Sequence, residues 1–249
     1  KQLETKAGGL SAEEIIKNVN QVFKLKNTRA VSLRRLLKYF LSKLLPSPFQ
    51  KQKKLFKKQV GDASKQLSFL NENSMVFDVG GYHGQWASDI YSMYNCEIQV
   101  FEPVPDFAKK IKERFFKNRK IKVNFFGLSN KTREAVISVS DDSSSTTREV
   151  GNQKVSVSLV DILEFIKQYN VKKIDLLKVN IEGEEYSLLN RIIDSGYINK
   201  IDNILVQFHN FFPEAKREME KIQNKLKNSH APIYKFEFIW ELWKKNDHR

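Results

Sequence analysis

The chain of 249 residues carries 43 lysines and arginines against 29 aspartates and glutamates, a formal net charge of +14 at pH 7. Its hydrophobic content of 41% excludes a wholly disordered chain, and its apolar runs are far shorter than the roughly 18 residues of a membrane-spanning helix. The single cysteine, Cys96, excludes a disulfide framework and a cysteine-rich zinc site, so we expect a reducing, cytoplasmic setting.

The positive charge is concentrated in the first 73 residues, which hold 16 basic and 5 acidic residues, whereas residues 74–249 hold 27 and 24. Leucines and Phe40 recur at helical spacing over residues 33–45, with cationic residues between them, until Pro46 and Pro48 end the pattern. We therefore predict a basic helical extension over residues 1–73 and a second domain over residues 74–249. The cations suit nucleic acid or an anionic membrane surface, and a solvated helical face fits equally well.

From residue 74 onward, strand-like and helix-like segments alternate. Strands are predicted over 75–79, 98–101, 122–126, 135–140, 154–157, 174–179 and 204–208, and strand composition returns over 233–243. Helices are predicted over 85–94, 106–118, 159–169 (capped by Ser158), 184–194 and 214–228. Strands that alternate with helices indicate βαβ units, so the sequence predicts a three-layer α/β/α fold with a mostly parallel sheet.

The turn after the first predicted strand combines an acid with glycines. A dinucleotide fingerprint requires glycine where this chain has Asp78, followed by Gly80, Gly81 and Gly84. An acid there repels a pyrophosphate but suits an ammonium group such as that of a methionine moiety. The pattern therefore favours S-adenosylmethionine over NAD, although a tight turn with an acidic cap remains the structural alternative. Glu102, at the end of the second predicted strand, is placed to accept hydrogen bonds from ribose hydroxyls.

Three later strand ends carry further polar residues. Gly127, Leu128 and Ser129 follow the third strand and are candidates for contact with an adenine ring. Lys178, Asn180 and Glu182 alternate toward the end of the buried strand over 174–179, which predicts that they face one cleft. His209 follows the next strand and is either a general base or a packed, hydrogen-bonded histidine.

Five segments in this order resemble the FkbM-type family of S-adenosylmethionine-dependent methyltransferases. They are FDVGGYHG (77–84), FEP (101–103), GLSN (127–130), IDLLKVNIEGEE (174–185) and QFHN (207–210). The resemblance implies a class I, Rossmann-like methyltransferase with a seven-stranded sheet whose last strand is antiparallel. It also implies S-adenosylmethionine as cofactor and methyl transfer to oxygen, typically to a sugar hydroxyl of a glycan, glycolipid or glycosylated metabolite.

Carried over by position, the resemblance implies that Asp78, Gly80, Gly84 and Glu102 hold the cofactor. It implies that Lys178, Glu182 and His209 lie by the methyl group. The full predicted sets and roles add our own interpretation of the residues. The predicted cofactor site comprises Asp78, Gly80, Gly81, Gly84, Glu102, Pro103, Gly127, Leu128 and Ser129. The predicted catalytic residues are His209, Glu182, Lys178 and Asn180: His209 or Glu182 accepts the proton, Lys178 orients the carboxylates or lowers the pKa of the acceptor, and Asn180 binds substrate or cofactor. No metal ligand is predicted, and participation of a divalent metal is left open.

The chain departs from the family pattern at three positions. Asn180 stands where an aspartate is expected, Gln207 where an acid before the histidine is common, and Val160 at a position that is usually acidic. These changes favour, as one alternative, a non-catalytic relative that binds a partner. A second alternative is a nucleic-acid methyltransferase that uses the basic arm, although the N/D-P-P-Y/F type of loop is missing after the fourth strand. The basic segment over 33–45 is predicted to dock on an anionic membrane or glycolipid, or to pack on the catalytic domain as a lid.

Overall fold

The computed structural model describes residues 46–140, 143–145 and 153–246, so the helix predicted over 33–45 lies outside the described residues. The chain divides into two compact units, residues 1–51 and residues 52–249. The second unit begins before residue 74, where the sequence analysis places the start of the second domain.

Seven strands form the larger sheet in the described part of the chain, in the order β10-β11-β9-β8-β1-β2-β3. They are β1 (Met75–Val79), β2 (Glu97–Phe101), β3 (Ile121–Asn124), β8 (Leu176–Val179), β9 (Asn203–Val206), β10 (His230–Phe236) and β11 (Trp240–Lys245). Strand β11 is antiparallel to both of its neighbours, and the other pairs are parallel. This sheet confirms the predicted mostly parallel arrangement and its antiparallel last strand, and the composition over 233–243 belongs to a hairpin of two strands.

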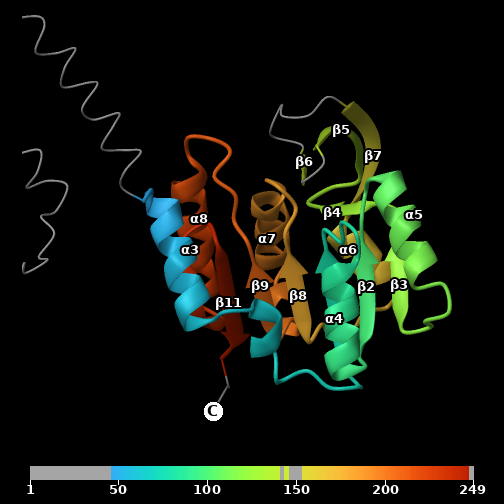
Figure 1. Cartoon of the computed structure of the whole chain (residues 1–249), viewed down its shortest axis with the longest axis horizontal. Coiled ribbons are helices and arrows are strands. Elements are labelled where there is room, and N and C mark those ends of the chain that lie inside the picture. The colour runs from blue at the N-terminus through green and yellow to red at the C-terminus, as the bar shows by residue number, and fades with distance from the viewer. Residues whose placement is uncertain (1–45, 141–142, 146–152, 247–249) are drawn as a thin grey trace, which may run out of the picture. The chain divides into compact units, whose positions relative to one another are not determined.

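Helices cover both faces of this sheet (Figure 1). They are α3 (Pro48–Gln59), α4 (Gln85–Tyr94), α5 (Pro105–Arg114), α6 (Ile162–Gln168), α7 (Glu185–Asp194) and α8 (Ala215–Leu226), with short 3-10 turns at Ala63–Gln66 and Tyr197–Lys200. Alternate residues of each central strand supply two separate cores. Val76 and Leu176 pack with α4 and α5, whereas Phe77 and Leu177 pack with α6, α7 and α8. The three-layer α/β/α prediction is therefore confirmed.

Helix α3 is attached to the hairpin β10–β11 by one aromatic side chain. Phe56 is buried, and its ring meets the Phe236 ring edge-on at 5.4 Å between centroids. Pro48, which the sequence analysis treats as a helix terminator, is the first residue of α3. Proline is well tolerated there because the first helical N–H has no intrahelical partner in any case.

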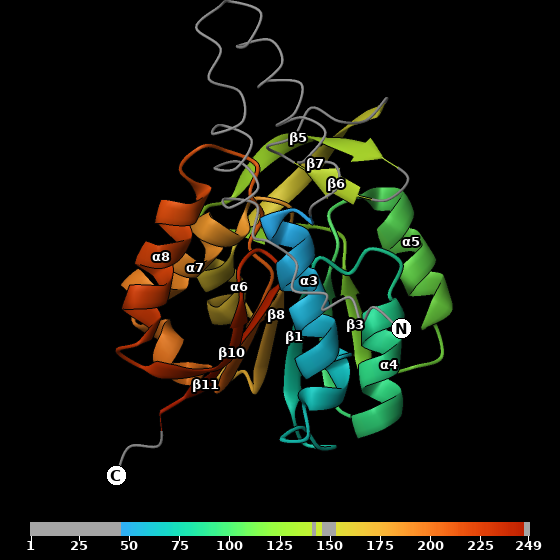
Figure 2. The ribbon, with the colours of Figure 1, turned by 60° about the vertical axis from the view of Figure 1, so that its left-hand side comes forward.

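A smaller sheet of four described strands lies between β3 and β8 in the sequence. It contains β4 (Gly127–Ser129), β5 (Arg133–Ser140), β6 (Ser143–Ser145) and β7 (Gln153–Asp161), in the order β4-β7-β5-β6. Its apolar side chains, including Ile137 and Val157, pack against Val104, which follows the carboxyl end of β2. The small sheet therefore borders the edge of the large sheet where ligands bind in this type of fold (Figure 2).

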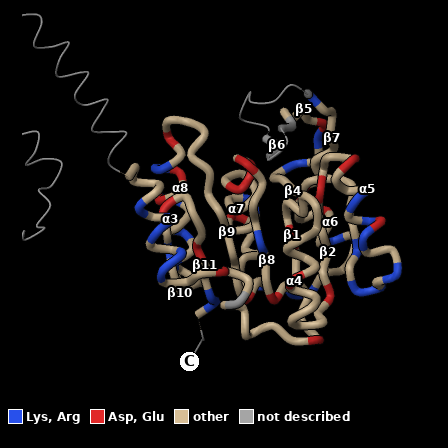
Figure 3. The backbone as a smooth tube through the Cα atoms, in the orientation of Figure 1, with Lys and Arg blue, Asp and Glu red and all other residues tan. Residues whose placement is uncertain are grey.

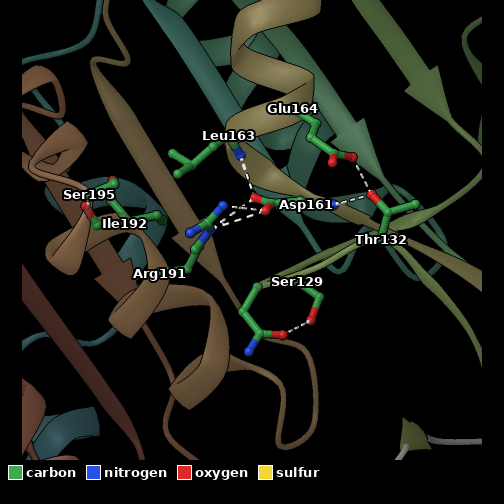
Figure 4. A network of polar contacts seen from close by, with 9 residues as sticks. Ser129, Thr132, Asp161, Leu163, Glu164, Arg191, Ile192 and Ser195 are labelled. Carbon is green, nitrogen blue, oxygen red and sulfur yellow. Dashed lines mark hydrogen bonds and ion pairs between the residues drawn. The ribbon is translucent and has the colours of Figure 1, made fainter.

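The prediction of a helix over 159–169 was wrong at its N-terminal end, since α6 begins at Ile162. Strand β7 continues to Asp161, because Val157 and Leu159 are buried while Ser158 is exposed, which is the alternation of a strand. Asp161, rather than Ser158, caps α6 by accepting a hydrogen bond from the Leu163 amide at 2.9 Å. It also accepts three hydrogen bonds from Nε and Nη2 of Arg191 in α7, so one carboxylate joins β7, α6 and α7 (Figure 4).

Gly80 marks a very close approach between the turn after β1 and the chain after β8. Its φ is 89°, and a Cβ built on it would lie 2.0 Å from the Asn180 carbonyl oxygen. A side chain at this position is therefore excluded both by backbone conformation and by the neighbouring carbonyl.

We expect Gly80→Ala to lower the free energy of unfolding by about 3 kcal/mol or more, because the two central strands must separate to admit the methyl group. Gly196→Ala is the matched control. Gly196 has a φ of 75° but nothing within 4 Å of its built Cβ, so it loses only about 1 kcal/mol. Urea denaturation of both variants measures the difference, and equal losses would show that the Asn180 contact imposes no constraint.

Candidate functional site

Asp78 and Lys178 form a buried ion pair between the two central strands. They are direct partners in the β1–β8 register, and Lys178 Nζ donates to Asp78 Oδ1 and to the Gly80 carbonyl oxygen, both at 2.7 Å. Asp78 is fully buried and Lys178 is 4% exposed. Burial raises the pKa of Asp78, and the Lys178 charge opposes that rise. The structure therefore places Lys178 beneath the glycine turn as the counter-ion of Asp78.

Two buried oxygen atoms near this pair have no hydrogen-bond partner among the described residues. They are Asp78 Oδ2 and Asn180 Oδ1, at the ends of β1 and β8. A buried acceptor without a donor costs free energy unless a ligand supplies one. Asp78 Oδ2 is a suitable acceptor for the ammonium group of a methionine moiety. Asn180 Oδ1 is a second acceptor that a bound ligand could use.

Glu102, the predicted partner of ribose hydroxyls, lies 3% exposed at the end of β2. Its carboxylate accepts hydrogen bonds from the Tyr82 amide at 2.8 Å and from the Val104 amide at 2.9 Å. Burial raises the pKa of Glu102 to about 7, while these two amides act in the opposite direction. The two amides hold the carboxylate beside the glycine turn, and each of its oxygens keeps a further lone pair for a hydroxyl donor.

At the other predicted cofactor positions, packing within the protein determines which residue type fits. A Cβ on Gly81 would lie 2.3 Å from a Val100 methyl carbon, and one on Gly84 would lie 3.0 Å from the Phe115 ring. These glycines were predicted to belong to the cofactor site, whereas neighbouring side chains already require glycine there. Gly127 packs against Pro103 and Leu159 in the same way, and Leu128 lies in the main core.

Ser129, predicted to contact an adenine ring, belongs to a polar network that joins the small sheet to the start of α7. Its hydroxyl donates to Glu184 at 2.6 Å and accepts from Arg133 at 2.8 Å. Arg133 also forms an ion pair with Glu184 at 2.7 Å. Because Ser129 is fully buried, these contacts connect the small sheet to the turn that precedes α7.

His209 lies beside two glutamates of that turn. Its Nδ1 is 3.1 Å from Glu185 Oε1, and its Nε2 is 3.5 Å from Glu182 Oε1. Glu185 Oε1 also accepts the backbone amide of His209 at 2.7 Å, and Glu185 Oε2 accepts the Gly183 amide at 2.7 Å. A carboxylate only accepts hydrogen bonds, so Nδ1 donates its proton to Glu185, while Nε2 faces Glu182.

Glu182 has a backbone conformation that side chains rarely adopt. Its φ is 53°, and Gly183 beside it has a φ of 118°. Non-glycine residues in this region cost about 1 kcal/mol or more and cluster at functional sites. The strained turn brings Glu182 to the Nε2 side of His209, which agrees with the predicted grouping of these two residues.

Glu185 was missed by the sequence analysis, although it is fully buried beneath His209. The run Glu182, Glu184 and Glu185 reads as the charged start of a helix, where exposed acids are common. Glu185 faces inward because the chain after β9 brings His209 against it. Sequence periodicity carries no sign of this contact.

The fold and the site together define a class of protein. A mostly parallel sheet with β11 reversed, an acid–glycine turn after β1 and a glutamate at the end of β2 are the features of a class I methyltransferase that binds S-adenosylmethionine. The residues present fit that cofactor, because Asp78 Oδ2 offers an acceptor for its ammonium group and Glu102 offers one for its ribose.

The family follows from the sequence itself. The family model of the methyltransferase FkbM domain matches residues 78–247, so the chain belongs to this family and is an S-adenosylmethionine-dependent methyltransferase. No curated protein matches the chain in sequence.

Solved structures resemble the fold at low identity. An rRNA methylase from Streptococcus thermophilus is 10% identical with a TM-score of 0.46, over 74% of this chain and 95% of that one. TrmK of M. capricolum, in complex with S-adenosylhomocysteine, is 12% identical with a TM-score of 0.43, over 75% and 70%. A precorrin-6y C5,15-methyltransferase from Geobacter metallireducens is 10% identical with a TM-score of 0.41, over 74% and 86%.

No group of three or more His, Cys, Asp or Glu side chains within the described ranges is arranged to hold a metal ion. None of the helices described combines the length and the apolar character that crossing a bilayer requires.

We expect Lys178→Met to lower the free energy of unfolding by about 3 to 5 kcal/mol at neutral pH, because the Asp78 carboxylate then remains buried without its cation. The double variant Lys178→Met/Asp78→Asn should recover part of this loss, since no buried charge is left. Urea denaturation measures both variants. A double variant as unstable as the single one would argue that the ion pair is not the source of the effect.

The raised pKa of Glu102 predicts a pH dependence of cofactor binding. Hydroxyl donors favour the carboxylate, so the affinity for S-adenosylmethionine should rise as the pH increases toward 7 and level off above that value. At the steepest part of the curve, the affinity for S-adenosylmethionine should change about tenfold per pH unit. Calorimetry at a series of pH values measures it, with Glu102→Gln as the control whose affinity stays level below pH 7. An equal slope in the control would assign the titration to another group.

Proposed function

We propose that this methyltransferase transfers its methyl group to oxygen, with a sugar hydroxyl of a glycan, glycolipid or glycosylated metabolite as the acceptor. The observation that supports transfer to oxygen is the buried contact between His209 and Glu185. A hydroxyl must lose a proton as its oxygen is methylated, and this site holds a histidine whose Nδ1 is oriented by a buried carboxylate. The sugar is the acceptor class implied by the family resemblance.

The protein residues act on the acceptor and its proton. Bound S-adenosylmethionine supplies an electrophilic methyl group on a sulfonium, whose leaving group is already activated. His209 Nε2 accepts the hydroxyl proton, and Glu185 stabilises the imidazolium that results through Nδ1 at 3.1 Å. Glu182, at 3.5 Å from Nε2, lies where an acceptor hydroxyl must approach and orients it by accepting a hydrogen bond.

Lys178 and Asn180 take roles different from direct proton transfer. Lys178 donates to Asp78 and to the Gly80 carbonyl, so it holds the glycine turn in place. Asn180 presents its unpartnered Oδ1 near that turn and hydrogen-bonds substrate or cofactor. The amide at position 180 is therefore compatible with catalysis, since the proton acceptor lies on His209.

The test is methyl transfer by the full chain to a panel of sugars and glycolipids, with products identified by mass spectrometry. We expect His209→Ala to lower the rate at least about 100-fold, because the general base is lost. Glu185→Gln should reduce the rate and change its pH profile, since the imidazolium loses its carboxylate partner. Glu182→Gln should act mainly on the KM for the acceptor.

Glu220→Gln is the matched control, because Glu220 is exposed on α8 and lies outside this site. It should leave both rate and pH profile unchanged. Near-normal rates in His209→Ala would dismiss histidine as the base. Binding of S-adenosylmethionine without transfer to any sugar would favour a nucleic-acid acceptor, and absence of cofactor binding would favour a non-catalytic relative.

The predicted contact of residues 33–45 with an anionic membrane or glycolipid, or their packing as a lid, lies outside the described residues. That role of residues 33–45 stays a prediction. A cytoplasmic location of the protein, including the membrane surface, also stays a prediction.

A further inference from the structure

A second concentration of positive charge lies within the catalytic unit. Residues 109–122, from α5 to the start of β3, contain eight lysines and arginines and a single acid, Glu113. The sequence-based prediction of a basic region was limited to residues 1–73, because the net charge of the remainder is close to neutral. Figure 3 shows the cationic residues gathered along α5 and the loop that follows it.

Part of this segment lines an open groove of about 600 Å³ between α4 and the α5–β3 loop. Four cations face it, Arg114, Lys117, Arg119 and Lys120, together with the aromatic rings of Phe115 and Phe116. The groove is therefore both cationic and aromatic.

The four cations are not neutralised by acids. Arg114 donates to the His83 carbonyl at 3.3 Å and to Gln85 Oε1 at 2.9 Å, and Lys120 donates to the Asn95 carbonyl at 2.6 Å. These acceptors are uncharged. In the part of the chain that the structure describes, no carboxylate pairs with any of the four. Their full positive charge is available to an anionic ligand.

The aromatic rings are placed for stacking. Phe116 is 76% exposed, and the Lys117 ammonium lies 5.4 Å from the centre of its ring. The Arg114 guanidinium lies 5.5 Å from the centre of the Phe115 ring. An exposed ring beside a cation is the combination with which proteins bind a base and its phosphate together.

Arg114 and Lys120 contact opposite ends of α4. Arg114 reaches His83 and Gln85 at the start of α4, and Lys120 reaches Asn95 at its end. Helix α4 has 10 residues, which is about 15 Å at 1.5 Å per residue. The groups that Arg114 and Lys120 contact are therefore separated by about the length of α4, which suits cations that bind more than one phosphate.

We propose that this groove binds single-stranded nucleic acid, with phosphates on the four cations and a base stacked on Phe116. A groove with aligned cations fits a phosphodiester chain better than a bilayer, which presents a broad flat surface. The proposal is independent of the methyl acceptor, because it concerns binding to a different surface and requires no catalysis.

The test is binding of a fluorescent single-stranded RNA of about 12 nucleotides to the full chain, measured by anisotropy at several salt concentrations. Four phosphate contacts predict that log affinity falls with log salt with a slope of about −3. Lys117→Glu/Arg119→Glu should weaken binding at least about tenfold and make the slope shallower. Phe116→Ala should weaken it about tenfold with little change in slope.

Two matched charge reversals serve as controls. Lys167→Glu/Lys172→Glu changes exposed lysines at and beyond the end of α6, and Lys54→Glu/Lys58→Glu changes exposed lysines of α3. Both should weaken binding much less than the groove variant. Equal weakening by a control pair would overturn the proposal, because it would show attraction by net charge alone.

The same variants distinguish other ligands. Adenosine monophosphate binding as tightly as the RNA would overturn the proposal in favour of a mononucleotide site. Phosphatidylserine vesicles that bind the wild type but not Lys117→Glu/Arg119→Glu, with RNA binding unchanged, would overturn it in favour of a membrane surface. Because none of these assays contains a methyl donor, their failure leaves the proposed methyl transfer untouched.

Discussion

The buried ion pair between Asp78 and Lys178 connects the two central strands to the glycine turn. A lone buried charge costs several kcal/mol, so neither residue is stable there without the other. The Lys178 ammonium also donates to the Gly80 carbonyl. The Gly80 Cα in turn lies so close to the Asn180 carbonyl that no side chain fits between them. The ends of β1 and β8 are thereby held at one separation, which places Asp78 Oδ2 and Asn180 Oδ1 beside the turn.

The rest of the site is built outward from this junction by carboxylates with backbone partners. Glu102 accepts the Tyr82 and Val104 amides, and Glu185 accepts the Gly183 and His209 amides. Each of these acids accepts two backbone amides, so the backbone itself holds the carboxylate in position. Such preorganisation is what a site requires when catalysis depends on positioning.

The small sheet contributes stability around the site. Arg133 and Ser129 bind Glu184, the residue that caps the start of α7, and Asp161 binds Arg191 within α7. These two contacts attach α7 to the small sheet at both the beginning and the later part of the helix. Because Glu182 and Glu185 flank Glu184, the small sheet fixes the turn that carries the proposed catalytic acids.

The sequence by itself determined the layered fold, the strand and helix ranges of 75–79 and 85–94, and the set of strand ends that bear polar residues, because local periodicity encodes these features. It also located Asp78, Glu102, Glu182 and His209. Only the tertiary structure decided that Lys178 is the counter-ion of Asp78 and that Glu185 faces His209. It also decided that Arg114, Lys117, Arg119 and Lys120 share a groove. The physical reason is that these relations depend on register between strands and on turns between distant segments, which no local pattern specifies.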